Sequence, residues 1–248
     1  MINLFHLFLI SLIGSVFGLI GGIVFLFNKK LSSILETNSI PFAAGVMITA
    51  SVLGLLPEAF ELIESKAFVV VLISFFTAYL FEHLIFGIHH HADNHHEGDR
   101  DIKSSVPLVV LGDTIHNFID GVAMGAAYLV SPGLGLATAL STFLHEVPHE
   151  IGDFGILIKA GWRKRDVLTL NLISSVASII GAFAVLWFSE NDSLIGILLS
   201  VSAGIFLYLG SIDFLPRAAK GFPNKLKAAV PLCIGIASML LILILLPH

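Results

Sequence analysis

Long apolar stretches alternate with short polar segments along nearly the whole chain. Each stretch is long enough to cross about 30 Å of hydrocarbon as an α-helix, which takes roughly 20 residues. No cationic segment precedes the first stretch and no convincing small-residue cleavage site follows it, so we expect a retained helix and not a signal peptide. The pattern predicts eight transmembrane helices, near Leu4–Phe27, Ile40–Phe60, Ala67–Ile88, Val106–Val130, Gly133–Ile158, Val167–Phe188, Ser193–Leu215 and Ala228–Leu246.

The overall composition favours the same class of protein. Of the 248 residues, 56% are hydrophobic and only 12% are charged, and the mean hydropathy is +0.94. Such a chain is too apolar for an ordinary soluble domain. We therefore predict an all-α polytopic membrane protein with a single transmembrane domain over residues 1–248, in contact with membrane lipid and without a nucleic-acid partner.

Lysine and arginine fall almost entirely on one side of the predicted eight-helix arrangement, and Lys66 alone lies opposite. Basic residues near helix ends collect on the cytoplasmic side of a membrane. We therefore expect both termini to lie outside the cytoplasm, and residues 89–105 to form a cytoplasmic loop. The residues on the basic side are Lys29, Lys30, Arg100, Lys103, Lys159, Arg163, Lys164, Arg165, Arg217, Lys220, Lys225 and Lys227.

Predicted helices two and seven share a sequence pattern at one fixed offset without a gap. Ala44-Gly45 matches Ala203-Gly204, Leu56-Pro57 matches Leu215-Pro216, and Ala59 matches Ala218. Because these helices run in opposite directions through the membrane, the match predicts an inverted repeat of helices one to three and six to eight around helices four and five. A chance match between two helices rich in small apolar residues is the alternative.

Predicted helices four and five carry five carboxylates and three histidines in otherwise apolar surroundings. These residues lie in the segments Asp113-Thr-Ile-His-Asn-Phe-Ile-Asp120 and His145-Glu-Val-Pro-His-Glu-Ile-Gly-Asp153, which contain no lysine or arginine. A charge near the centre of a transmembrane helix costs roughly 2.5 kcal/mol or more. The acids therefore need protons or a bound cation.

Helical geometry brings the two segments together. At about 100° per residue, the polar side chains of each helix share one face. The short turn at Ser131-Pro132-Gly133 makes the helices antiparallel neighbours, and both sets lie about 20 Å from that turn, close to mid-membrane. The facing side chains are Asp113, His116, Asn117 and Asp120 on helix four, and His145, Glu146, His149, Glu150 and Asp153 on helix five.

The mixture of imidazole and carboxylate indicates which cation would bind. It suits zinc and its neighbours, whereas magnesium or calcium would favour oxygen ligands alone. Zinc is the favoured ion, and iron, manganese and cadmium remain alternatives because the same ligands accept them. A hydrogen-bond network that only joins helices and a proton relay are weaker hypotheses, since neither accounts for three histidines at chelating spacing.

Two motifs resemble those of the ZIP (Zrt/Irt-like) family of divalent-metal transporters. His116-Asn-Phe-Ile-Asp-Gly121 fits the family pattern HNFxDG, and His145-Glu-Val-Pro-His-Glu-Ile-Gly-Asp153 fits HExPHExGD. The resemblance covers essentially the whole chain. Arg217, at the end of predicted helix seven, departs from the acid that is usual there.

The resemblance implies a set of roles for these residues. His116, Asp120, His145 and His149 would line the primary metal site, Asn117 and Glu146 would contribute to an adjacent site, and Asn171 would join it. The resemblance also implies a homodimer in a plasma or bacterial inner membrane, in which helices one, four, five and six carry metal into the cytoplasm past a scaffold of helices two, three, seven and eight.

Further polar residues extend the predicted path. Asp113, Glu150, Asp153 and Asp213 are candidate pathway residues. A cluster of histidines in the predicted cytoplasmic loop would collect or sense metal, unless it is only a solvated polar loop. Its members are His89, His90, His91, His95 and His96.

Two other functions compete with a carrier. His145-Glu-Val-Pro-His149 also satisfies HExxH, the zinc-protease pattern in which the glutamate activates water. A broad double row of polar residues exceeds what three ligands and one water require, so we expect no enzyme activity and no catalytic cofactor. A metal-selective channel is the second alternative.

Overall fold

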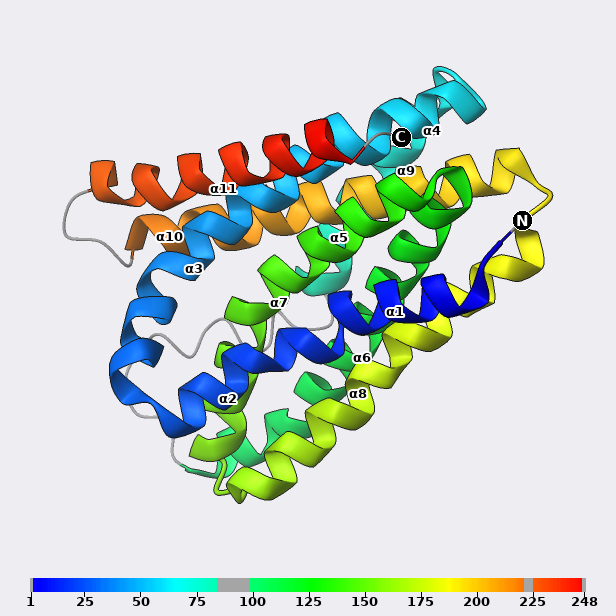
Figure 1. The fold of residues 1–248 in the computed structure, drawn as a ribbon. Coiled ribbons are helices and arrows are strands. Elements are labelled where there is room, and N and C mark those ends of the chain that lie inside the picture. Colours follow the sequence, from blue (N-terminus) through cyan, green and yellow to red (C-terminus); the bar gives the residue numbers. More distant parts are fainter. Residues whose placement is uncertain (1, 84–98, 221–224, 247–248) are drawn as a thin grey trace.

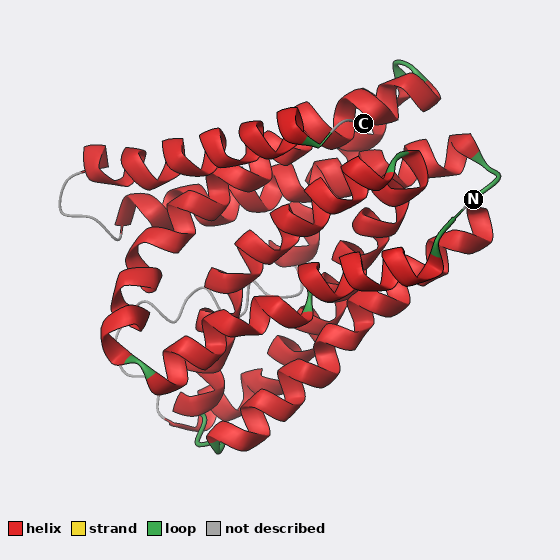
Figure 2. Ribbon diagram, viewed as in Figure 1, coloured by secondary structure: helices red, strands yellow, loops and turns green. Residues whose placement is uncertain are grey.

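A computed structural model of the chain describes residues 2–83, 99–220 and 225–246, and nearly all of them are helical (Figures 1 and 2). The predicted histidine-rich cluster at residues 89–96 lies outside the described residues. The helices are α1 (Leu4–Gly14), α2 (Ile20–Phe27), α3 (Lys29–Thr49), α4 (Leu56–Ile63), α5 (Lys66–Phe81), α6 (Asp99–Val130), α7 (Pro132–Lys159), α8 (Lys164–Ala184), α9 (Asp192–Tyr208), α10 (Leu215–Lys220) and α11 (Lys225–Leu245).

Several consecutive helices join end to end into longer rods. A 3₁₀ turn over Val16–Leu19 links α1 to α2, while π-helical segments over Ala50–Leu55 and Leu209–Phe214 link α3 to α4 and α9 to α10. Each π segment ends two residues before a proline, Pro57 or Pro216. A proline has no amide hydrogen for the preceding turn, and the wider π turn accommodates its ring without breaking the rod.

Within the described residues, the predicted transmembrane spans fall on these helices or rods. Five helical stretches are long and apolar enough to cross a membrane, and α5 is a shorter apolar helix. The α7 helix is also long enough but carries Glu146, Glu150 and Asp153. The chain is thus a multi-pass membrane protein, and the total of eight crossings stays a prediction. The five stretches are Leu4–Phe27, Thr37–Ile63, Lys164–Phe188, Asp192–Ala218 and Lys227–Leu245.

The rods form two packed groups. The first contains α3, α5, α9 and α11, in which α3 packs along α11 and α5 packs along α9. The second contains α1, α2, α6, α7 and α8, in which α8 packs along α6 while α1 and α2 pack along α7. Both termini lie at the end of the molecule that also holds the α4–α5 and α8–α9 connections, and the α2–α3 and α7–α8 connections lie at the opposite end (Figure 1).

The two groups pack tightly near the α6–α7 turn and separate toward the other end. Near the turn, Ala127 of α6 and Leu134 of α7 join one apolar core with Leu199 of α9 and Met47 of α3. Beyond the middle of the molecule, a cavity of about 1160 Å³ lies between the groups. Its lining includes Glu82, Lys159 and Arg217, which mark the end remote from the turn. The polar centre is therefore sealed on the turn side and accessible from the other.

Glycines set how closely α6 and α8 approach. A methyl group on Gly121 would collide with the carbonyl oxygen of Ser178, and one on Gly181 would collide with the carbonyl oxygen of Phe118. Backbone contact at this distance is typical of small-residue helix interfaces in membranes. Gly152 of α7, by contrast, has open space where its side chain would be.

This difference gives a direct test of the α6–α8 contact. Gly121→Ala should destabilise the protein by about 1–3 kcal/mol, because the added methyl group must push α8 away. The matched change Gly152→Ala adds the same group in open space and should leave stability unchanged or slightly higher. Thermal unfolding of the purified variants in detergent would measure both. Equal midpoints for the two variants would contradict the packing described here.

Candidate metal site

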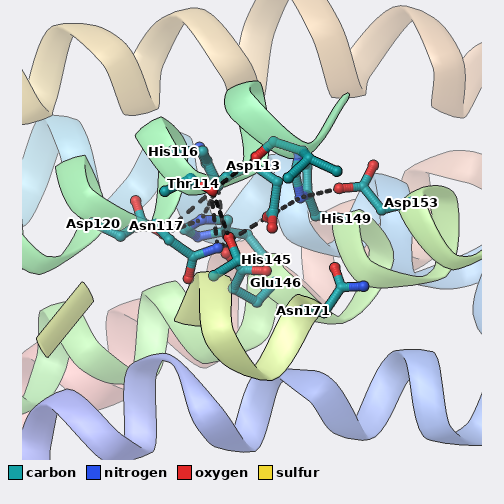
Figure 3. A network of polar contacts seen from close by, with 12 residues as sticks. Asp113, Thr114, His116, Asn117, Asp120, His145, Glu146, His149, Asp153 and Asn171 are labelled. Carbon is teal, nitrogen blue, oxygen red and sulfur yellow. Dashed lines mark hydrogen bonds and ion pairs between the residues drawn. The ribbon is translucent and has the colours of Figure 1, made fainter. Parts of the chain in front are cut away.

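Four side chains from α6 and α7 converge at the centre of the molecule (Figure 3). His145 Nε2 lies 3.0 Å from Asp120 Oδ2 and 3.3 Å from His116 Nε2. His116 Nε2 is also 3.6 Å from Asp120 Oδ2 and 3.6 Å from Glu146 Oε1. Two ligand atoms bound to one tetrahedral zinc ion are separated by about 3.4 Å, given bonds of roughly 2.1 Å. The four residues, defined here as the inner group, therefore already have the spacing of a zinc site.

Burial of the inner group leaves acidic oxygens without protein partners. Asp120 and Glu146 are each 1% exposed. Among the described residues, Asp120 Oδ1 and both carboxylate oxygens of Glu146 have no hydrogen-bond donor. A buried carboxylate in this condition is costly unless a cation or a proton neutralises it. A bound divalent ion would satisfy these oxygens together with the histidine nitrogens.

The peptide backbone orients His145 toward this position. His145 Nδ1 lies 3.0 Å from the carbonyl oxygen of Ser141, one turn earlier in α7. A carbonyl can only accept a hydrogen bond, so Nδ1 carries a proton and Nε2 is the nitrogen left for a metal. A carbonyl behind a metal-binding histidine fixes its tautomer and ring orientation in this way.

A second set of ligands lies beside the first. Asp113, His149 and Asp153, defined here as the outer group, place His149 Nδ1 4.0 Å from Asp113 Oδ1 and 3.8 Å from Asp153 Oδ2. The side chain of His149 is 29% exposed, whereas that of His145 is fully buried. The rings of His116 and His149 stack with centroids 4.6 Å apart, so they connect the two groups.

The cavity reaches these residues from one end of the protein. Asp113, His116, His149 and Asp153 line it, as does Asp213 near its mouth. The other three inner-group residues, Asp120, His145 and Glu146, are more deeply buried and do not line the cavity. A cation held by the inner group could therefore pass to the outer group and then into the cavity.

The structure divides the predicted ligands differently from the family resemblance. The inner group includes Glu146, which the resemblance assigned to an adjacent site, and the outer group includes His149, which it assigned to the primary site. His145 and His149, although one turn apart, thus point to different groups. Asp113 and Asp153, predicted as pathway residues, supply the carboxylates of the outer group.

The remaining predicted residues lie close by in other roles. Asn117 donates to Asp113 Oδ1 at 2.9 Å and accepts a hydrogen bond from Ser178 at 2.9 Å. Asn171 is buried and donates to the carbonyl oxygen of Val167. Glu150 is buried, and its Oε2 has no hydrogen-bond partner among the described residues.

Hydroxyl groups around the site were not predicted from the sequence. Ser178 of α8 fixes the Asn117 amide, and the hydroxyls of Thr114 and Ser174 lie 3.2 Å apart between α6 and α8. Isolated serine and threonine are common in membrane helices, so they gave little signal. The recurrence of serine at positions 174, 175 and 178, along one face of the helix beside α6, was the available clue.

The fold and the site define a class: a multi-pass helical membrane protein with two groups of candidate metal ligands at its centre. Comparison with known sequences then identifies the family. The family model described as "ZIP Zinc transporter" matches residues 92–243, which include both polar segments. The chain belongs to the ZIP zinc transporter family.

Individual relatives agree with this family. The chain is 34% identical over 150 residues to "Zinc transporter foi" of Drosophila melanogaster, covering 59% of this chain and 21% of that protein. It is 42% identical over 113 residues to "Zinc transporter ZIP4" of Homo sapiens, covering 46% of this chain and 18% of that protein. The matched region thus spans about a fifth of the length of each of these relatives.

The geometry predicts which histidine a metal needs. Replacing His145 with alanine removes the nitrogen that faces both Asp120 and His116, so zinc affinity should fall by more than about tenfold. His6→Ala is the matched control, because His6 is exposed at the N-terminal end of α1. Titration of purified protein with zinc in detergent measures both variants. Equal affinities for His145→Ala and the unmodified protein would exclude the inner group as the main site.

Proposed function

We propose that this protein is a transporter that moves a divalent transition metal, with zinc as the favoured ion, into the cytoplasm. The observation that carries the proposal is the inner group, in which two histidines and two carboxylates lie at zinc-ligand spacing in a buried centre. The names of the relatives, which are zinc transporters, agree with this cargo. Iron, manganese and cadmium remain alternative cargoes, since similar ligands bind them.

The proposed direction rests on charge and on the cavity. Basic residues gather at the cavity end, where Lys159 and Arg217 line the opening and Arg163 follows α7. The positive-inside rule favours the cytoplasm on that side, which places both termini outside it in a plasma or bacterial inner membrane. The protein as described is then open to the cytoplasm and sealed on the outside. This is the state from which a carrier releases its cargo.

Local geometry supports the proposed inverted repeat. The offset of 159 residues that separates Ala44 from Ala203 also relates the π segment Ala50–Leu55 to the π segment Leu209–Phe214. Helix packing follows the same relation, since α3 packs along α11 as α9 packs along α5. Gly45 lies against the carbonyl oxygen of Leu232, and its counterpart Gly204 lies against that of Val71. These shared features favour the repeat over a chance match of apolar sequence.

The origin of the ligands favours an elevator-type carrier over a channel. Among the described residues, both candidate ligand groups come from α6 and α7, and the facing helices α3, α5, α9 and α11 supply none of their ligands. A movement of α6 and α7 with their neighbours could therefore carry an intact site past the helices α3, α5, α9 and α11. We further propose, from the family resemblance, that two copies assemble as a homodimer. The helices α3, α5, α9 and α11 would form its fixed part.

A metalloprotease is disfavoured by the position of the two histidines of HExxH. In such an enzyme both histidines bind one ion and the glutamate acts on water. Here His145 and Glu146 belong to the inner group, while His149 faces Asp113 and Asp153. Cleavage of a membrane substrate that Glu146→Gln abolished would favour the enzyme instead.

Transport can be tested with purified protein in liposomes that contain a zinc-sensitive dye. His116→Ala and His149→Ala should each reduce zinc uptake by more than about tenfold, because each removes a ligand from one group and breaks the stacked contact between them. His6→Ala should transport normally. Unchanged uptake in both ligand variants, with the protein inserted, would reject the proposal.

The histidine-rich segment calls for a separate experiment. Deletion of residues 89–96 should leave zinc uptake measurable, because both metal groups lie within α6 and α7. We expect an altered apparent affinity or altered regulation by internal zinc. Complete loss of uptake by the folded deletion variant would mean that the segment forms part of the path.

A further inference from the structure

An ion pair lies at the mouth of the cavity, through which the metal would leave in the proposed transport. Arg217 Nε lies 3.0 Å from Asp213 Oδ1, and both residues line the cavity. They belong to the rod formed by α9 and α10: Asp213 lies in the π segment before Pro216, and Arg217 lies one turn later in α10. The side chain of Asp213 is 14% exposed and that of Arg217 is 51% exposed, so the acid lies inside the mouth and the base at its rim.

The pair shares its cavity with the outer group. Asp213 and Arg217 line the same cavity as Asp113, His149 and Asp153. Asp213 is therefore placed to add a carboxylate to the Asp113, His149 and Asp153 set that a cation meets on its way out. Arginine cannot lose its proton, so its positive charge opposes a divalent cation at any physiological pH.

We propose that Arg217 keeps Asp213 from acting as a metal ligand and so weakens cation binding at the inner mouth, which promotes release to the cytoplasm. A carboxylate occupied by a guanidinium has fewer lone pairs for a metal, and the guanidinium charge repels the ion itself. Arg217 lowers the affinity for the cation in this scheme and does not bind the metal. The inference rests on the proposed transport function.

The opposite end of the protein supports this assignment. At the offset of 159 residues, the position equivalent to Arg217 is Glu58, in α4 at the other end of the molecule. Under the proposed repeat, the two mouths therefore carry opposite charges at equivalent positions. An acid at the outer mouth attracts cations, and a base at the inner mouth favours their departure.

The test is the affinity of the purified full chain for Zn²⁺ and Cd²⁺, measured by titration in detergent. Arg217→Gln should tighten the weaker phase of binding by roughly threefold to tenfold, and zinc uptake into liposomes should slow because release is slower. The double variant Arg217→Gln/Asp213→Asn should return to the affinity of the unmodified protein. Arg217→Lys, which retains the charge and the spacing, should remain close to it.

The chain provides a matched control. Arg163 forms an ion pair with Asp166 at 2.7 Å on the same end of the protein, but this pair is exposed and does not line the cavity. Arg163→Gln removes the same charge and should leave affinity and uptake unchanged. Equal affinities for Arg217→Gln and Arg163→Gln, or a tightened affinity that persists in the double variant, would overturn the inference.

The two proposals fail in different ways. If the unmodified protein neither binds nor transports zinc, the proposed function is wrong. If it binds and transports zinc while Arg217→Gln behaves in the same way, only the role of Arg217 is wrong.

Discussion

Burial of carboxylates without basic partners is the constraint on which the rest of the structure depends. Glu146 lies at the centre of the protein with no hydrogen-bond donor among the described residues to either oxygen. Such a group destabilises a helix bundle unless a cation or a proton neutralises it. The antiparallel α6–α7 pair answers this need, because the turn at Ser131, whose side chain caps α7 at Leu134, fixes the register in which the histidines face the acids. The remaining helices hold that register in place.

Hydroxyl and amide groups that are not themselves candidate ligands hold the ligand side chains in place. Ser178 of α8 holds Asn117, which in turn holds Asp113, so the packing of α8 on α6 is transmitted to a ligand of the outer group. The backbone carbonyl oxygen of Ser141 accepts a hydrogen bond from His145 and orients its ring from within α7. Ligands held in this way lose little conformational freedom when an ion binds. The close contact at Gly121 is part of the same arrangement, because it brings Ser178 within reach.

Much of this arrangement was predictable from the sequence, and the details that were not predictable have a physical origin. Periodicity and the position of one turn were enough to place the polar faces of α6 and α7 opposite each other. Periodicity could not predict that His145 and His149 would join different groups, because one-turn spacing fixes the face of a helix and not the direction of each ring. It also could not distinguish Gly121, pressed against α8, from Gly152, which faces open space. That distinction depends on the neighbouring helix.

The two sides of the polar centre differ in the part of the chain that the structure describes. In the described state the difference lies in packing: Ala127, Leu134 and Leu199 close one side of the centre, and the cavity opens the other. Alanine and leucine surfaces can slide past one another without leaving polar groups unpaired, whereas a seal built from ion pairs would have to break them. An apolar seal beside a self-contained metal site therefore suits a protein in which α6 and α7 move with their cargo. Because the ligands neutralise the ion, moving it together with them requires less free energy than moving the bare charge.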